Sequence, residues 1–130
     1  MDLYRLLDRP DLPDWMRVRI EDRLTQPPIE AVRDLLQMYV NDSCGFDEIR
    51  RELRPVTGFE TAFLRLQLDA LERVLAEPQP KGTLLWLVEL DANHGMDHDP
   101  TDRGAAVFLR QIADLVREAL AEAEGELPGR

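Results

Sequence analysis

Apolar residues recur every three or four positions along most of the chain, which is the spacing of one face of an α-helix. Prolines, glycines and short polar segments interrupt this pattern and mark where helices begin and end. The helix over residues 59–77 has apolar positions over a wide arc, so we expect it to be central, with neighbours on two sides. The pattern as a whole predicts helices over residues 2–8, from 11 or 13 to 26, 29–40, 46–53, 59–77 and 100–124.

The segment Thr83–Leu90 is apolar at almost every position, so its periodicity does not distinguish a buried strand from a short helix. No second strand-like segment is present to pair with it, and we therefore expect a helix. Its N-cap would be Thr83, and Gly95 would end it. The whole chain is then an all-α bundle of five to seven helices in a single domain over residues 1–124, followed by an acidic, disordered tail over residues 125–130.

The length and the net charge of the chain limit the kinds of partner that we expect it to bind. The chain has 130 residues, enough for one hydrophobic core, and carries 16 Lys plus Arg against 26 Asp plus Glu, a formal net charge of −10. This charge disfavours nucleic acid, because phosphate is repelled, and favours a basic protein partner, whose encounter it accelerates. Solubility alone would explain the same charge. No apolar run is long enough to span a membrane, and the first residues do not resemble a signal peptide, so no membrane contact and a cytoplasmic location are expected.

Both histidines of the chain and four of its carboxylates fall within residues 91–102. Imidazole nitrogen and carboxylate oxygen together are typical ligands of first-row transition metals. The candidate metal ligands are Asp91, His94, Asp97 and His98. Their spacing matches neither the helical zinc-protease motif nor the calcium-binding loop, so a metal site is one of two interpretations.

The second interpretation, which the pattern favours, is structural. Asp99 would cap the last helix, Pro100 would occupy its first position, and Asp102 would lie in its first turn, where the helix dipole favours negative charge. Under this interpretation residues 91–102 form a connecting loop that binds no metal.

Sequence motifs that would indicate catalysis are missing. There is no glycine-rich phosphate loop, no nucleophile elbow and no Cys-X-X-Cys motif, and the single cysteine, Cys44, is expected to be an inert thiol. We therefore predict no catalytic residue and no cofactor, and favour a protein that is not an enzyme. Trp15 and Trp86 are expected in the core, the commoner position of tryptophan, with a role as interface anchors as the alternative.

Four stretches carry a family resemblance: Leu36-Gln-Met-Tyr39-Val-Asn-Asp42, Phe46-Asp-Glu-Ile, Leu66-Gln-Leu-Asp-Ala-Leu71-Glu-Arg-Val-Leu75-Ala-Glu-Pro78 and Phe108-Leu-Arg-Gln-Ile112. In their order along residues 35–124, they resemble one branch of the bacterial immunity proteins of contact-dependent growth inhibition systems. The resemblance implies a small, non-catalytic helical protein that binds and neutralises a toxin domain made by its own cell or by its siblings.

An acidic protein suits such a role, because many toxin domains that act on nucleic acid are basic. The contact surface that we predict consists of the acids of the polar loop, Asp91, Asp97, Asp99 and Asp102. Two other interpretations stay open. One is a metal-binding helical protein that uses His94 and His98, and the other is a helical scaffold or oligomerisation module, since a homo-oligomer is compatible with the sequence.

Overall fold

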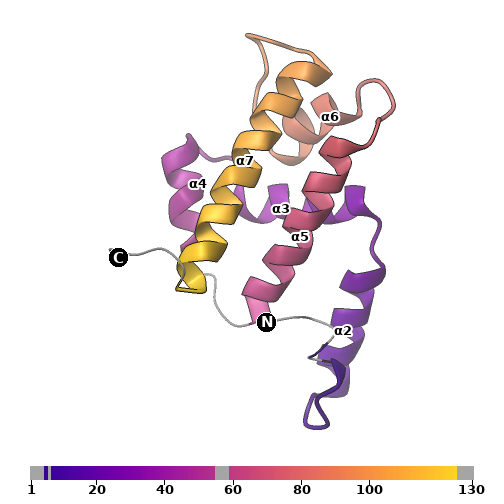
Figure 1. Cartoon of the computed structure of the whole chain (residues 1–130). Helices are drawn as coiled ribbons and strands as arrows, with labels where there is room; N and C mark the ends of the chain where they lie inside the picture. Colours follow the sequence, from indigo (N-terminus) through magenta and orange to yellow (C-terminus); the bar gives the residue numbers. More distant parts are fainter. Residues whose placement is uncertain (1–4, 6, 55–58, 126–130) are drawn as a thin grey trace.

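The computed structural model describes residues 5, 7–54 and 59–125, and of Phe59 only the backbone. The predicted helix over residues 2–8 and the predicted tail over 125–130 lie largely outside the described residues. The described part contains α2 (Asp14–Thr25), α3 (Pro28–Tyr39), α4 (Phe46–Leu53), α5 (Phe59–Ala76), α6 (Thr83–Trp86), the π-helical segment η1 (Leu87–Asp91) and α7 (Asp102–Ala123) (Figure 1). This part of the chain has no strand, which confirms the all-α prediction. None of its helices combines the length and the apolar composition needed to cross a membrane.

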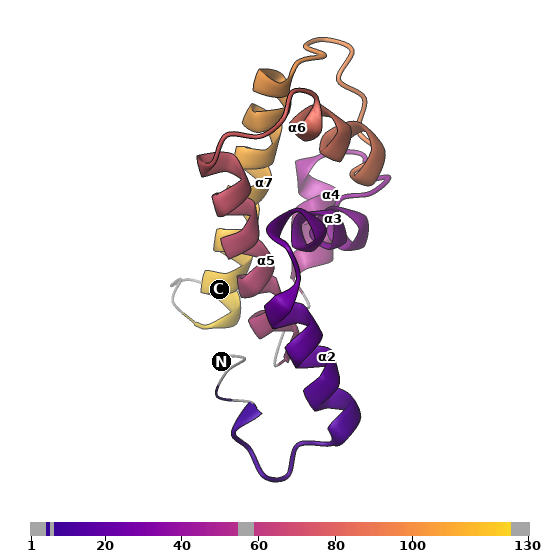
Figure 2. The ribbon, with the colours of Figure 1, turned by 90° about the vertical axis from the view of Figure 1, so that its right-hand side faces the viewer.

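The helices are arranged in two layers. α5 and α7 lie side by side in one layer, and α3, α4 and the α6–η1 segment cover one side of them (Figures 1 and 2). α2 projects beyond this bundle and packs against the first half of α5. Because α5 contacts both α3 and α7, the predicted central position of this helix is confirmed.

The core forms because each helix turns one apolar face inward. Leu35 and Leu36 of α3 meet Ile112 of α7 and the apolar face of α5 in the main cluster, and all three of these side chains are fully buried. Burial of each such side chain contributes about 1.5–3 kcal/mol to the free energy of unfolding. A smaller cluster around Ile20 and Ala62 attaches α2 to α5.

The bounds of α3, α4 and α5 lie within one residue of the predicted ones. Pro28 occupies the first position of α3, where the missing N–H is not needed, and Pro27 precedes it as the N-cap. Local signals of this kind act within one turn of the helix, which explains why the sequence predicts these ends well.

The predicted N-cap Thr83 is wrong. Gly82 precedes α6 in a left-handed conformation with φ 90°, and Thr83 is the first helical residue. The carboxylate of Asp102, in the first turn of α7, accepts hydrogen bonds from the backbone N–H groups of Gly82 at 2.7 Å and Leu85 at 3.0 Å. A residue distant in sequence therefore supplies the cap of α6, and no local pattern reveals it.

The predicted end of this helix at Gly95 is also wrong. After Trp86 the chain widens into a π-helix, in which the N–H of Ala92 donates to the carbonyl of Leu87 at 3.1 Å. Asn93 then adopts φ 50°, a left-handed conformation that asparagine tolerates better than most residues. The helical segment therefore ends at Asp91.

At the start of α7, Thr101 replaces the predicted cap Asp99. The Thr101 hydroxyl accepts a hydrogen bond from the N–H of Gly104 at 3.0 Å, and the helix begins at Asp102 instead of Pro100. The same hydroxyl donates to Asp99 Oδ1 at 2.7 Å, so Asp99 supports the cap without forming it. The placement of Asp102 in the first turn is confirmed.

Candidate functional site

Asp91, the first residue of the polar loop, joins the end of η1 to α3. Its Oδ1 atom accepts hydrogen bonds from Arg33 Nε at 3.2 Å and from Gln37 Nε2 at 2.8 Å. Its backbone carbonyl accepts a third, from Asn41 Nδ2 at 3.1 Å. The hydrogen bond and the negative charge of Asp91 raise the pKa of the Arg33 guanidinium above its usual value. Asp91 is thus engaged in contacts within the chain.

The two histidines line a small cavity beside the first half of α7, with a volume of about 260 Å³. The His94 ring stacks on Phe108, with centroids 4.3 Å apart and an angle of 15° between the ring planes. In the part of the chain that the structure describes, no three His, Cys, Asp or Glu side chains are grouped so as to hold a metal ion. The four candidate metal ligands are therefore not brought together, since Asp91 binds α3 while His94 packs on a ring of α7.

The other loop acids differ in how they are used. Asp99 accepts the Thr101 hydroxyl, and Asp102 caps α6, as described above. The N–H groups of Gly82 and Leu85 lower the pKa of Asp102, because they stabilise its charged form. Asp97 is exposed. Of the four acids predicted to contact a partner, Asp97 is thus the most available to one.

Trp86 and Leu90 form the most exposed apolar pair next to this loop. Each retains 67% of its accessible surface, and they are four residues apart on one face of the α6–η1 segment. The predicted core position of Trp86 is therefore wrong, and so is that of Trp15, which is 64% exposed on α2. Large apolar side chains exposed next to one another are typical of surfaces that bind other molecules.

A groove of about 390 Å³ lies beside this pair, between α3 and the α6–η1 segment. We name it the Trp86 groove. Its floor and rim consist of Ile29, Arg33, Thr83, Trp86, Leu87, Leu90 and Asp91. It therefore combines apolar side chains with one ion pair, Arg33–Asp91, at its edge.

The π-helix belongs to this groove. η1 buries Leu87 and Val88 in the core while Leu90 stays exposed. Short π-helical segments are rare, and they often occur at functional sites, because their hydrogen-bond geometry is less favourable than that of an α-helix. The π-helical backbone of η1 and its exposed Leu90 are therefore both features of the Trp86 groove.

Sequence reasoning missed Leu90, Ile29 and Arg33 as members of one site. A signal was present, because residues 84–88 are all apolar, and a helical segment of this kind either lies fully inside a core or leaves one face for a partner. No pattern near Ile29 and Arg33 in the sequence indicates that α3 would line this groove.

The Trp86 groove has the chemistry of a binding surface. Its lining holds no nucleophile next to a base and no pair of carboxylates, so it offers shape, apolar area and one ion pair. No protein-family model, curated protein or solved structure matches the chain. The interpretation of this groove therefore comes from its own geometry.

Proposed function

We propose that this chain is a non-enzymatic interaction protein that binds a basic protein partner through the Trp86 groove. The observation that carries the proposal is the exposure of Trp86 and Leu90, at 67% each, on one helix face next to an open groove. Tryptophan is enriched among the residues that dominate binding energy at protein interfaces. Burial of these two side chains by a partner would supply the hydrophobic part of the interaction.

The charge of the chain favours a basic partner over a second copy. Two copies would each bring a net charge of −10 to the interface and would repel one another. At the rim of the groove, the positive charge of Arg33 faces the carboxylates of Glu30 at 3.3 Å and Asp91 at 3.2 Å, which leaves a local charge of −1. A partner with apolar anchors flanked by lysine or arginine complements this rim.

The finer form of the proposal is an immunity protein that neutralises a toxin domain. It is supported by the resemblance over residues 35–124 and by the acidic charge of the chain. On this account the protein acts by covering its partner and needs no catalytic residue of its own.

The test is affinity capture from the native host with three tagged baits, namely the unmodified chain, Trp86→Ala and Trp15→Ala. Trp15 is a matched control, because it is equally exposed but lies on α2. We expect a basic protein in a stoichiometric amount with the unmodified chain and with Trp15→Ala. The affinity of Trp86→Ala for that protein should be at least about tenfold weaker, as expected for an interface anchor.

Two results would contradict the proposal. One is recovery of the bait alone from a host that is shown to express a neighbouring toxin gene. The other is capture by Trp86→Ala with the same affinity as by the unmodified chain, which would show that the partner does not bind at the groove. The immunity form further requires that the captured protein inhibit growth when expressed alone and that coexpression of this chain restore growth.

A further inference from the structure

A second cavity, which shares no lining residue with the Trp86 groove, lies where α2, α3, α4 and α5 meet, and has a volume of about 290 Å³. We name it the Gln67 cavity, after the buried amide in its lining. Gln67 lies on α5 and is only 2% exposed. Its only hydrogen-bond partner among the described residues is the Met38 sulfur, 3.8 Å from Nε2, and sulfur is a weak acceptor. A buried amide normally forms stronger hydrogen bonds, so this amide has unused capacity on the cavity side.

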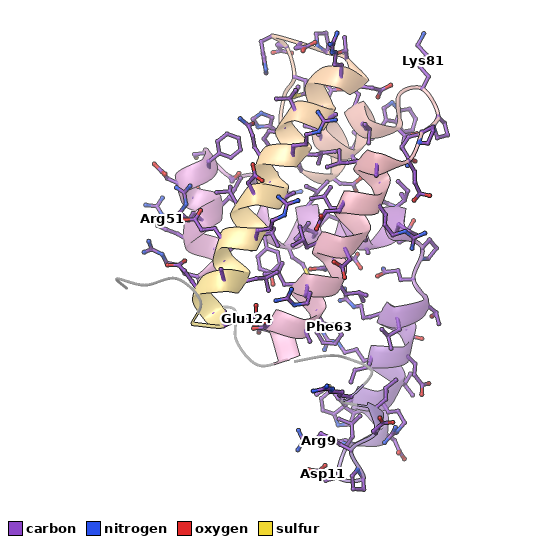
Figure 3. All side chains as sticks on the ribbon, viewed as in Figure 1. Arg9, Asp11, Arg51, Phe63, Lys81 and Glu124 are labelled. Atoms are coloured by element: carbon purple, nitrogen blue, oxygen red, sulfur yellow. The ribbon has the colours of Figure 1, made fainter. Side chains whose placement is uncertain are left out.

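The walls of the Gln67 cavity are aromatic and apolar. Phe63 lines it one turn before Gln67 on α5, and Tyr39 and Met38 line it from the end of α3. Figure 3 shows Phe63 near the start of α5, on the side that faces α2. Burial and the nearby Glu60 carboxylate raise the pKa of Tyr39, so its hydroxyl stays protonated and can donate a hydrogen bond. Such walls suit an apolar or aromatic body.

The mouth of the Gln67 cavity carries charges of both signs. The guanidinium carbons of Arg19 and Arg23 lie 5.8 and 5.4 Å from the centroid of the Phe63 ring. Arg23 is paired with Asp34 at 3.3 Å, whereas Arg19 forms no ion pair with a described residue. Glu52 and Glu60 line the same cavity and also lack an ion pair within the described part. One guanidinium and two carboxylates are therefore available to a ligand.

We propose that the Gln67 cavity binds a small zwitterion with an apolar body, of the size of one free amino acid. A ligand carboxylate would lie against Arg19, its ammonium group against Glu52 or Glu60, and its side chain between Tyr39 and Phe63. The Gln67 amide would form a hydrogen bond with one of the two charged groups of the ligand. An anion alone would meet these carboxylates and the field of a chain with a net charge of −10, and a cation alone would leave the Arg19 guanidinium without a partner. A zwitterion avoids both penalties, and the volume suits a ligand with a single ring.

The test compares three probes by titration calorimetry and by changes in backbone amide NMR shifts. L-phenylalanine carries both charges, phenylpropanoate lacks the ammonium group, and phenethylamine lacks the carboxylate. We expect L-phenylalanine to bind about tenfold more tightly than either analogue, with shift changes at the residues that line the cavity.

Variants of the full chain locate the site. Gln67→Met keeps the length of the side chain and removes the amide, and Arg19→Gln removes the guanidinium. Each should weaken L-phenylalanine binding about tenfold. Arg110→Gln, an exposed arginine on α7, is the matched control and should leave binding unchanged. Trp86→Ala should also leave it unchanged, which separates failure of this inference from failure of the proposed function.

Three results would overturn the inference. The first is the absence of saturable binding by any probe, and the second is equal affinity for all three. The third is unchanged binding in a folded Gln67→Met variant. If no probe binds but Arg19→Gln weakens capture of the protein partner, the cavity receives a partner side chain and the free-ligand assignment is wrong.

Discussion

Gly104 illustrates how a single residue fixes the polar loop against α7. A Cβ atom at this position would lie 2.6 Å from the backbone carbonyl oxygen and from the carboxylate of Asp99. The N–H of Gly104 also donates to Thr101, so the loop and the first turn of α7 approach each other closely at this point. Substitution by a residue with a side chain would therefore push the loop away from the helix.

We expect Gly104→Ala to lower the free energy of unfolding by about 1–3 kcal/mol, because backbone atoms in the loop cannot move aside as a flexible side chain can. The matched control is Gly95→Ala, where a Cβ would meet nothing within 4 Å. Urea denaturation of both variants measures the difference. A Gly104→Ala variant as stable as Gly95→Ala would show that the loop packs less closely than described.

At the scale of the element, local signals predicted where helices occur but not how the α6–η1 segment is built. Proline and glycine positions and the 3.6-residue period sufficed for α3, α4 and α5. The cap of α6 comes from Asp102, which is distant in sequence, and the end of η1 is bonded to α3 through Asp91. The exposure of Trp86 could not be predicted for the same reason, since an apolar run does not show which of its faces the rest of the fold will cover.

The cap of α6 should make stability depend on pH. The pKa of Asp102 is lowered in the folded state, so its contribution is complete above the ordinary value of about 3.8 and is lost as the pH falls through the lower, folded value. Asp102→Asn should reduce stability at neutral pH by about 1 kcal/mol, because the amide has one oxygen acceptor where the carboxylate offers one to each N–H group. Thermal unfolding followed by circular dichroism at a series of pH values measures this.

The difference between Asp102→Asn and the unmodified chain should shrink as the pH falls from the ordinary pKa to the lower, folded one, below which the aspartic acid is protonated in both states. Asp97→Asn, an exposed loop acid, is the control and should behave as the unmodified chain does. A constant difference across the acidic range would show that the charge of Asp102 is not what holds α6.

At the scale of the whole molecule, a chain with a net charge of −10 has two openings with apolar walls, the Trp86 groove and the Gln67 cavity. The exposed ion pairs of the described part each contribute little, so the excess of negative charge acts mainly on the rate of encounter with charged molecules. The Trp86 groove uses the start of α3 and the Gln67 cavity its end, and the two differ in size and in the charges that line them. We therefore assign the groove to a protein partner and the cavity to a small molecule.

The candidate site was only partly predictable at this scale. Net charge indicated a basic partner, and the loop acids indicated the neighbourhood of Asp91, which does line the groove. The apolar part of the surface comes from Ile29 and the α6–η1 segment, which only the tertiary packing brings together. The prediction from charge therefore placed the partner contact on the acids of the polar loop, whereas the exposed apolar side chains Trp86 and Leu90 lie beside that loop.

The most direct measurement of the central claim is hydrogen–deuterium exchange of this chain alone and in complex with the captured basic protein. We expect slower exchange in the complex over residues 29–33 and 83–91, the two segments that line the Trp86 groove, and no change in α2 around Trp15. Protection confined to other helices, with exchange over 83–91 unchanged, would contradict the assignment of this groove as the partner-binding surface.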